Sequence, residues 1–289
     1  MKRIAILVIA ILATTLIYGQ KATDNITLNY DVSSFENIRI HNFKGNVSVK
    51  TKPGNTLSLK VKRTLKAKTG KKLEAAKQEV YLDTTIIDNE LVVFMVAPQK
   101  YFKIDKDGNS YYQGNNWNNW SKNDIKEYDV EYEFEIEASV PANRNIYAAT
   151  HHKDVGVYGV QGNTTVKSHH GNVMATTGGD EVVARSHHGD VTVHHTSRSV
   201  SKGEYKTHHG DIKTSFPALS AKVTMASHHG SYFIDFDYEH VAQEVSMKKD
   251  GKTTKYKYGG DTSIKVGSGL GRLTYKTHHG DTYIINNKK

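Results

Sequence analysis

Adjacent histidine pairs recur along the second half of the chain and constrain its fold more than any other feature of the sequence. Successive pairs begin 18, 18, 21, 20 and 50 residues apart. Sixteen histidines placed at random in 289 residues would not produce such a series. A Ser or Thr precedes each pair, and Gly followed by Asp or Asn usually comes after it. The pairs are His151-His152, His169-His170, His187-His188, His208-His209, His228-His229 and His278-His279.

The length of this repeat points to a β-structure. It is too short for a pair of helices or a propeller blade, but it suits one coil of a β-solenoid. Gly-Asp and Gly-Asn form tight corners, in which we expect glycine to adopt a positive φ and Asp or Asn to bond nearby backbone. Alternating runs such as 173–176 and 191–194 flank the corners as strands. The spacing therefore predicts an all-β fold, a parallel β-solenoid (β-helix) with about 18–21 residues per coil.

Strand alternation predicts which histidine of each pair faces the interior. Side chains two positions apart share one face of a strand. The second histidine is in phase with residues such as Val166 and Tyr205, whereas the first is in phase with Lys167 and Lys206. We therefore expect the second histidines to be the more buried. These inward histidines are His170, His188, His209 and His229.

Stacked inner histidines would make the fold sensitive to acid. Burial and neighbouring positive charge both disfavour the charged imidazole and lower its pKa. The unfolded chain would then bind more protons below pH ~6.5, and the folded state would lose stability there.

The first histidines form a candidate metal site. Neutral imidazole is a common ligand for zinc and copper, and equivalent residues on stacked coils lie on neighbouring rungs. The alternative is structural: the histidines contact the corner backbone or solvent, no cofactor is needed, and any zinc or copper affinity is adventitious. The candidate ligands are His151, His169, His187, His208, His228 and His278.

The N-terminal half shows the same pattern more faintly. Strands are expected at 37–40, 56–61, 91–96 and 128–140, with a short helix at 73–80. An Asn-, Tyr- and Trp-rich segment near 105–124 is expected to be an exposed loop, which contacts a glycan or protein or folds back on the solenoid. Its candidate contact residues are Tyr111, Tyr112, Trp117 and Trp120.

The ends and the composition predict an exported protein. A basic start, an apolar run and small or polar residues near position 20 are typical of a signal peptide. The sequence has no Cys, so disulfides are excluded. The expected domains are 1–20 as signal peptide, 21–137 as N-terminal β coils with the helix and insertion, and 138–289 as the repeat solenoid. The expected location is the periplasm, the outer-membrane surface or the extracellular space.

Charge and motifs favour binding over catalysis. The net charge of +9 is scattered along the chain, which suits soluble β-edges and gives no specific nucleic-acid site. No transmembrane segment is expected in the mature chain. Gly-x-Ser-x-Gly and His-Glu-x-x-His motifs are absent from the sequence, and the repeats place every histidine in the same setting. We therefore expect no enzymatic activity.

The sequence resembles a bacterial family of exported β-strand-repeat proteins known as "putative adhesins". The matched positions are the Ser or Thr, the Gly and the Asp-Val or Asp-Ile of the repeats, together with 138–142 and 267–281. The resemblance implies a right-handed parallel β-solenoid with an adhesin-like or structural role at the cell envelope, and an unknown surface glycan or protein as partner. His-His replaces the usual Val-Asn, Lys153 replaces one glycine and Ser231 replaces one aspartate.

Overall fold

The computed structural model describes residues 21–98, 100–114, 130–197, 200–242, 245–250, 253–258 and 261–288. The chain divides into two compact units, residues 1–158 and 159–289, which are described separately. Among the described residues, no helix has both the length and the apolar character needed to span a bilayer.

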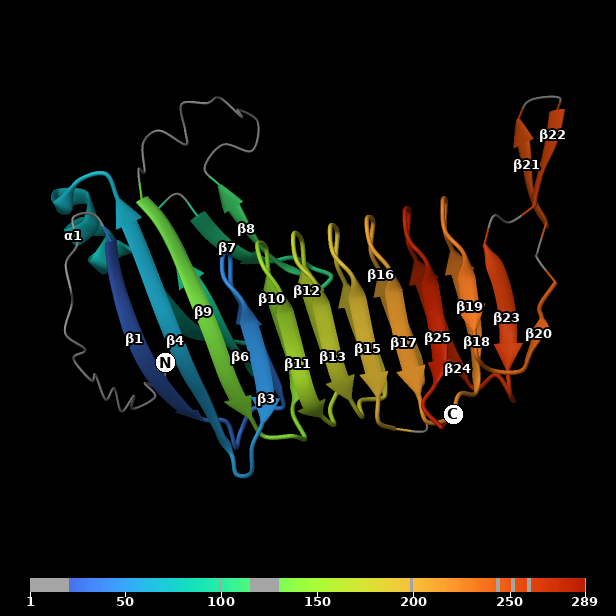
Figure 1. Cartoon of the computed structure of the whole chain (residues 1–289), viewed down its shortest axis with the longest axis horizontal. Coiled ribbons are helices and arrows are strands. Elements are labelled where there is room, and N and C mark those ends of the chain that lie inside the picture. The colour runs from blue at the N-terminus through green and yellow to red at the C-terminus, as the bar shows by residue number, and fades with distance from the viewer. Residues whose placement is uncertain are drawn as a thin grey trace. The chain divides into compact units, whose positions relative to one another are not determined.

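The first unit contains parts of two mixed β-sheets (Figure 1). One has the order β1 (Lys21–Asp31), β4 (Thr56–Ala67), β9 (Val130–Val140), β3 (Val47–Thr51) and β11 (Val155–Val160). The other has the order β10 (Asn145–Thr150), β2 (Asn37–His41), β6 (Glu90–Val96) and β5 (Tyr81–Ile87). Strands β1, β4 and β9 pair antiparallel, as do β5 and β6, whereas β3 pairs parallel with β9 and β11.

A helix and a hairpin complete this unit. Helix α1 (Gly70–Glu79) begins after Thr69, whose hydroxyl accepts a bond from the backbone N–H of Lys72, and it buries Leu73 and Ala76. This confirms the short helix expected at 73–80. Strands β7 (Lys100–Ile104) and β8 (Ser110–Gly114) form an antiparallel hairpin. The expected loop at 105–124 is therefore wrong for 110–114, while 115–124 lie outside the described residues.

The second unit consists of short strands from two sheets. One sheet has the order β13 (Val173–Thr177), β15 (Val191–His195), β17 (Ile212–Phe216), β25 (Thr282–Asn286) and β19 (Tyr232–Ile234). The other has the order β20 (Tyr238–His240), β23 (Thr262–Val266), β18 (Ala221–Ala226), β24 (Gly271–Lys276), β16 (Lys202–Lys206), β14 (Glu181–Arg185) and β12 (Thr164–Ser168). A separate hairpin pairs β21 (Val245–Asp250) with β22 (Thr253–Tyr258).

Most pairs in the second unit are parallel. Strands β12, β14, β16, β24 and β18 pair parallel in this order, as do β13, β15, β17, β25 and β19. Strand β23 is an exception, because it pairs antiparallel with both β18 and β20. The fold is thus all-β with large mixed sheets that are not closed, and the prediction of uniformly parallel strands over 138–282 is wrong at β23 and at the antiparallel β21–β22 hairpin.

The last strands of the chain lie between earlier ones. Strand β24 pairs with β16 on one side and β18 on the other, and β25 pairs with β17 and β19 (Figure 1). The final His278-His279 unit therefore lies between His208-His209 and His228-His229. The sequence order of the repeats does not reveal this insertion.

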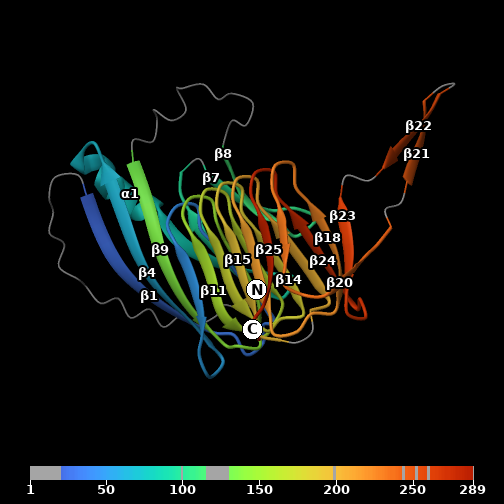
Figure 2. The ribbon, with the colours of Figure 1, turned by 45° about the vertical axis from the view of Figure 1, so that its right-hand side comes forward.

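The core of the second unit lies between its two sheets. Strands β15 and β25 belong to one layer and β14, β24 and β18 to the other (Figure 2). Val166, Ala184, Tyr205 and Tyr275 occupy equivalent positions on successive strands, and all are fully buried. The alternation read from the sequence therefore holds along the strands themselves.

Candidate functional site: a ladder of histidine pairs

Each histidine pair lies at a corner where the chain passes from one sheet to the other. Residues 186–190, for example, connect β14 to β15. Backbone bonds join equivalent corners, since the N–H of His188 donates to the carbonyl of His169 at 2.9 Å and the N–H of His279 donates to that of His208 at 2.9 Å. The corners therefore stack in the same register as the strands.

The Ser or Thr before each pair supports the neighbouring corner. The hydroxyl of Ser186 donates to the carbonyl of Gly171 at 2.8 Å, and that of Thr207 donates to the carbonyl of Gly189 at 2.7 Å. Ser186 and Thr207 are both buried. These hydroxyls satisfy backbone acceptors and are not free for nucleophilic chemistry.

The Asp and Asn residues form a second polar ladder. A side-chain oxygen of Asn172 accepts a bond from the backbone N–H of Asp190, Asp190 accepts from Asp211, and Asp211 accepts from Asp281, each at 2.9 Å. The N–H of Ser231 completes the series by donating to Asp281 at 2.9 Å. The aspartates are thus structural parts of the corner.

Glycine is required at the corners mainly because the backbones approach closely. A Cβ on Gly189 would lie 2.3 Å from the carbonyl oxygen of Gly171, and one on Gly230 would lie 1.8 Å from that of Gly280. Gly189 and Gly230 do not have positive φ values, so the expectation that glycine serves this conformation is wrong there. In the first unit, Lys153 occupies the glycine slot and has a φ of 97°.

The imidazole rings form two columns. First histidines stack in the order His169, His187, His208, His278 and His228, with ring centroids 4.7–4.9 Å apart and planes within 7°. Second histidines stack in the order His170, His188, His209, His279 and His229, at 4.9–5.2 Å and within 8°. Within each of these pairs the rings are 4.3–4.4 Å apart and inclined at 60–65°. Equivalent histidines therefore lie on neighbouring rungs, as the spacing predicts.

The predicted burial of the columns is wrong. His170, His188, His209 and His229 are all exposed, while the first histidines His169 and His208 are half-buried. Alternation holds up to the buried Ser or Thr and fails after it, because the chain turns at the corner and no longer follows the pleat. The second histidines consequently project into solvent.

The histidines favour their neutral forms at several rungs. Desolvation lowers the pKa of His187, His208 and His278 in the first column, and neighbouring histidines lower it further. The pKa of His188 and of His279 in the second column is lowered by the same causes. The direction predicted for the second histidines is thus found at His188 and His279, and the same direction also occurs in the first column.

Sequence reasoning missed a buried histidine inside the second unit. The Nε2 atom of His195 lies 2.7 Å from the hydroxyl of Tyr205, and its ring stacks on Phe216 at 4.4 Å. Burial, with a smaller contribution from His194, lowers its pKa to about 3. The signal was present in the sequence, because His195 is in phase with Val191 and Val193 along β15.

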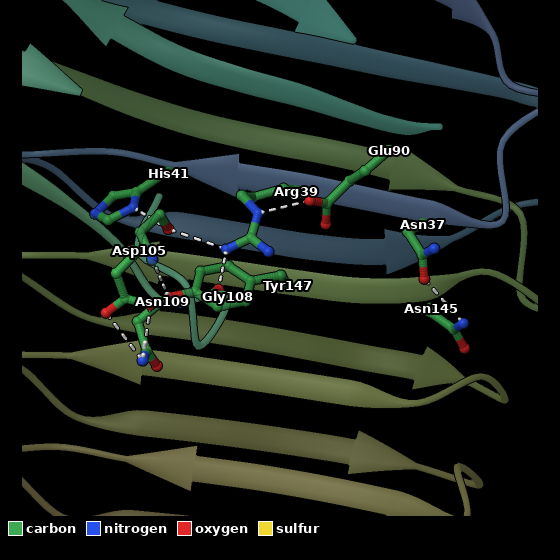
Figure 3. Close-up of polar contacts among 10 residues, drawn as sticks. Asn37, Arg39, His41, Glu90, Asp105, Gly108, Asn109, Asn145 and Tyr147 are labelled. Atoms are coloured by element: carbon green, nitrogen blue, oxygen red, sulfur yellow. Dashed lines mark hydrogen bonds and ion pairs between the residues drawn. The ribbon is translucent and has the colours of Figure 1, made fainter. Parts of the chain in front are cut away.

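A buried polar cluster occupies the first unit (Figure 3). The Nε atom of Arg39 donates to Glu90 at 3.0 Å, and its guanidinium lies 4.0 Å from the centre of the Tyr147 ring. An Nη1 hydrogen of Arg39 also bonds the carbonyl of Gly108 at 2.9 Å, in the turn between β7 and β8. Nδ1 of His41 lies 2.6 Å from the hydroxyl of Ser110. The cluster fastens the hairpin to β2.

The β7–β8 hairpin places the predicted aromatic contact residues in different environments. Tyr111 is exposed. The hydroxyl of Tyr112 donates to the carbonyl of His41 at 2.9 Å and accepts from the N–H of Met95 at 2.7 Å, and burial raises its pKa. Tyr112 is thus held in place by hydrogen bonds to β2 and β6 and does not serve as a surface contact. Trp117 and Trp120 lie outside the described residues.

Comparisons with known proteins give the chain no family. No family model matches it, and no curated protein matches it. Solved structures with some likeness include a "putative cell adhesion protein" from Clostridium sporogenes, with a TM-score of 0.40, 10% identity and coverage of 92% of this chain and 100% of that one. A "putative adhesin" from Bacteroides fragilis has a TM-score of 0.27, 12% identity and coverage of 90% and 97%. At these values the likeness supports no conclusion about this chain.

Proposed function

We propose that the chain is a non-enzymatic, exported, adhesin-like scaffold of the cell envelope. In this proposal the second unit is a right-handed parallel β-solenoid, and antiparallel strands cover its end. Its partner is a surface glycan or protein that contacts several rungs at once.

One observation carries the non-enzymatic part of the proposal. The Ser, Thr and Asp residues that a hydrolase would need are bonded to backbone groups of adjacent corners, such as Ser186 to Gly171 and Asp190 to Asp211. Catalytic groups need access to a substrate and a distinct local environment. The repeated corners give one structural role to the hydroxyls of Ser186, Thr207 and Thr277 and another to the carboxylates of Asp190, Asp211 and Asp281, so the exposed faces remain as the functional surface.

The outer face of one sheet carries matching positive charges. Lys202 on β16 is paired in register with Arg272 on β24, and Arg272 is paired with Lys222 on β18; all three side chains are exposed. Strands in a sheet lie about 4.8 Å apart, so the charges form a row across the strands. Such a row suits an extended anionic glycan better than a neutral one.

Retention on a sulfated glycan tests the binding proposal. Heparin beads should retain purified residues 21–289 more strongly than unsulfated dextran beads. A variant with Lys202, Arg272 and Lys222 changed to Gln should bind heparin about tenfold more weakly or worse, since each exposed charge contributes roughly 0.5–1 kcal/mol. The matched control changes Lys60, Lys62 and Lys66 in the first unit to Gln. Equal losses in the two variants would reject the row as the contact.

Export is tested separately by expressing the full sequence in a Gram-negative host. Mass spectrometry of the exported protein should locate its N-terminus near residues 19–22, where the sequence predicts cleavage. Full-length protein retained in the cytoplasm would contradict the proposed location.

A further inference from the structure

The two imidazole columns differ in how they can direct nitrogen lone pairs. A ring nitrogen presents its lone pair in the plane of the ring. Rings within one column are parallel to within 8°, so their lone pairs point in the same direction and do not converge. The predicted site made of first histidines alone therefore does not form a chelating set.

Rings from different columns can converge. The two rings of a pair are inclined at 60–65°, which allows in-plane lone pairs to meet at one point. At His228-His229 the Nδ1 atom of the first ring lies 2.8 Å from the Nε2 atom of the second. Two nitrogens bound to a tetrahedral zinc ion at about 2.0–2.1 Å are about 3.3 Å apart. A histidine pair therefore already brings its nitrogens to a chelating separation.

A third ligand is available on the adjacent rung. His169, His187 and His188 each offer a nitrogen, and these atoms lie within 4.8 Å of one another. His169 is half-buried, and His187 and His188 are exposed, so an ion can reach them from solvent. His169 and His187 stack within 3°, so the His169 ring must rotate about its side-chain bonds to turn its lone pair toward the ion held by His187 and His188. The same rotation would close the largest separation to the tetrahedral value.

The first column also contains buried nitrogens that lack a hydrogen-bond partner. Within the described part of the chain, neither Nδ1 of His208 nor Nδ1 of His278 bonds another group. Buried nitrogens are normally bonded to protein or ordered water. Their presence on successive rungs indicates that the inner side of the ladder presents nitrogens that the folded chain does not itself satisfy.

We propose that this ladder binds a divalent zinc- or copper-class ion between its two columns, through one nitrogen each of His169, His187 and His188. Imidazole nitrogen suits zinc and copper, and three protein ligands leave a fourth position for water or for a ligand donor. This inference does not depend on the adhesin-like function. It replaces a single-column site with a site that uses both histidines of one pair and one from its neighbour.

Metal titration of the purified chain tests the proposal. Isothermal titration of residues 21–289 with Zn²⁺ should show one tight site, with any further binding much weaker. Changing His169, His187 and His188 to Asn should weaken that site at least about 100-fold, because loss of outer-shell partners alone costs 10–100-fold. The control changes His194 and His240, exposed histidines outside the ladder, to Asn and should leave the affinity unchanged. Circular dichroism in EDTA checks that both variants fold.

A second measurement needs no variant. X-ray absorption of the native protein with one equivalent of Zn²⁺ should show four nitrogen or oxygen ligands near 2.0–2.1 Å, with outer-ring scattering that corresponds to about three imidazoles. One imidazole per ion, or equal weakening in the ladder and control variants, would overturn the proposed site and indicate adventitious binding. Repeating the heparin assay in EDTA distinguishes failure of one proposal from failure of the other. Heparin retention in EDTA would support the scaffold function whether or not the titration finds a zinc site.

Discussion

The two units of the chain share one set of corner contacts but differ in what accompanies it. In the first unit, Thr150 donates to the carbonyl of Gly45, and Asn46 accepts from the N–H of Asp154, as at the corners of the second unit. In the first unit, Asn42 is fully buried, and its amide group donates to the carbonyls of Lys44, Gly45 and Phe134. A unique cluster around Arg39 then fastens the β7–β8 hairpin. In the second unit, Ser186, Thr207 and Thr277 each donate to a glycine carbonyl of the adjacent corner, and the Asn and Asp contacts repeat beside them. The first unit thus adds individual buried contacts to its corner, whereas the second relies on repeating the corner contacts.

This difference has an energetic consequence. A unique buried network has no substitute when one member is removed, so the other members remain buried without partners. A ladder distributes its contacts over several equivalent rungs, and each rung contributes nearest-neighbour terms to the total. Single substitutions should therefore cost the most stability in the first unit. The exception is a substitution at a second-unit corner glycine, where an added Cβ has no space.

The largest expected effect is the loss of the buried ion pair in the first unit. The side chains of Arg39 and Glu90 are only 8% and 17% exposed. Changing Glu90 to Ala should destabilise the protein by about 3–5 kcal/mol, because the arginine charge stays buried without its carboxylate. Chemical denaturation measures this change.

An exposed ion pair supplies the control. The side chains of Lys66 and Glu131 are 57% and 71% exposed, so changing Glu131 to Ala should cost less than about 1 kcal/mol. Similar losses in the two variants would contradict the view that unique buried contacts dominate the first unit.

The next effect concerns space in the repeated corners. Changing Gly189 to Ala puts a methyl group against the carbonyl of Gly171, and the stacked corners on both sides limit any adjustment. We expect a loss at the upper end of about 1–3 kcal/mol, measured by denaturation. Gly70 is the control: its Cβ position meets nothing within 4 Å, so Ala there should be neutral or slightly stabilising. A tolerated Gly189→Ala change would show that the corner stack is looser than its distances imply.

Much of the fold could be predicted from the sequence because its signals are local. Alternation located the strands, and the repeat spacing predicted parallel rungs with equivalent histidines on neighbouring levels. The insertion of β24 and β25 between earlier strands could not be predicted. Residues 271–286 carry the same corner motif as both of their neighbours, so the motif does not specify which strands they pair with.

The candidate site was predicted only in part, for a related reason. The sequence identified the histidine pairs, but it assigned their burial by continuing the strand phase through a corner where the chain turns. It also placed the candidate metal ligands in one column, whereas the site proposed above uses both, because the inclination of rings within a pair depends on side-chain geometry. His195 was overlooked because it lies outside the motif, although its strand phase indicated burial.

The third effect is a loss of stability in acid, caused by His195. Its pKa is about 3 in the folded protein, against about 6.5 when unfolded. The unfolded state therefore binds more protons below pH ~6.5, and the stability present above that pH is lost progressively toward pH 3. Between pH 7.5 and 5 the loss should be about 2 kcal/mol, measured by urea denaturation at each pH.

Changing His195 to Gln isolates this contribution. The amide can still reach the hydroxyl of Tyr205 but does not titrate. The variant should be less stable at pH 7.5, yet it should lose about 2 kcal/mol less than the native protein on acidification. An unchanged acid loss would exclude His195 as its main cause.

The smallest expected effect belongs to the exposed second column. Changing His170, His188, His209 and His229 to Asn removes imidazoles that lower the pKa values of His187, His208 and His278 by charge repulsion. Those lowered values also favour the folded state above the unfolded pKa and cost stability below it, so the variant should lose slightly less in acid. Solvent screens these exposed rings, and the change should be much smaller than that of His195→Gln.

Melting temperatures between pH 7.5 and 5, recorded in EDTA to exclude bound metal, make the comparison. If the four Asn substitutions abolish the acid loss while His195→Gln leaves it intact, the exposed ladder rather than the buried histidine controls stability, and the contrast between unique and repeated contacts fails within the second unit.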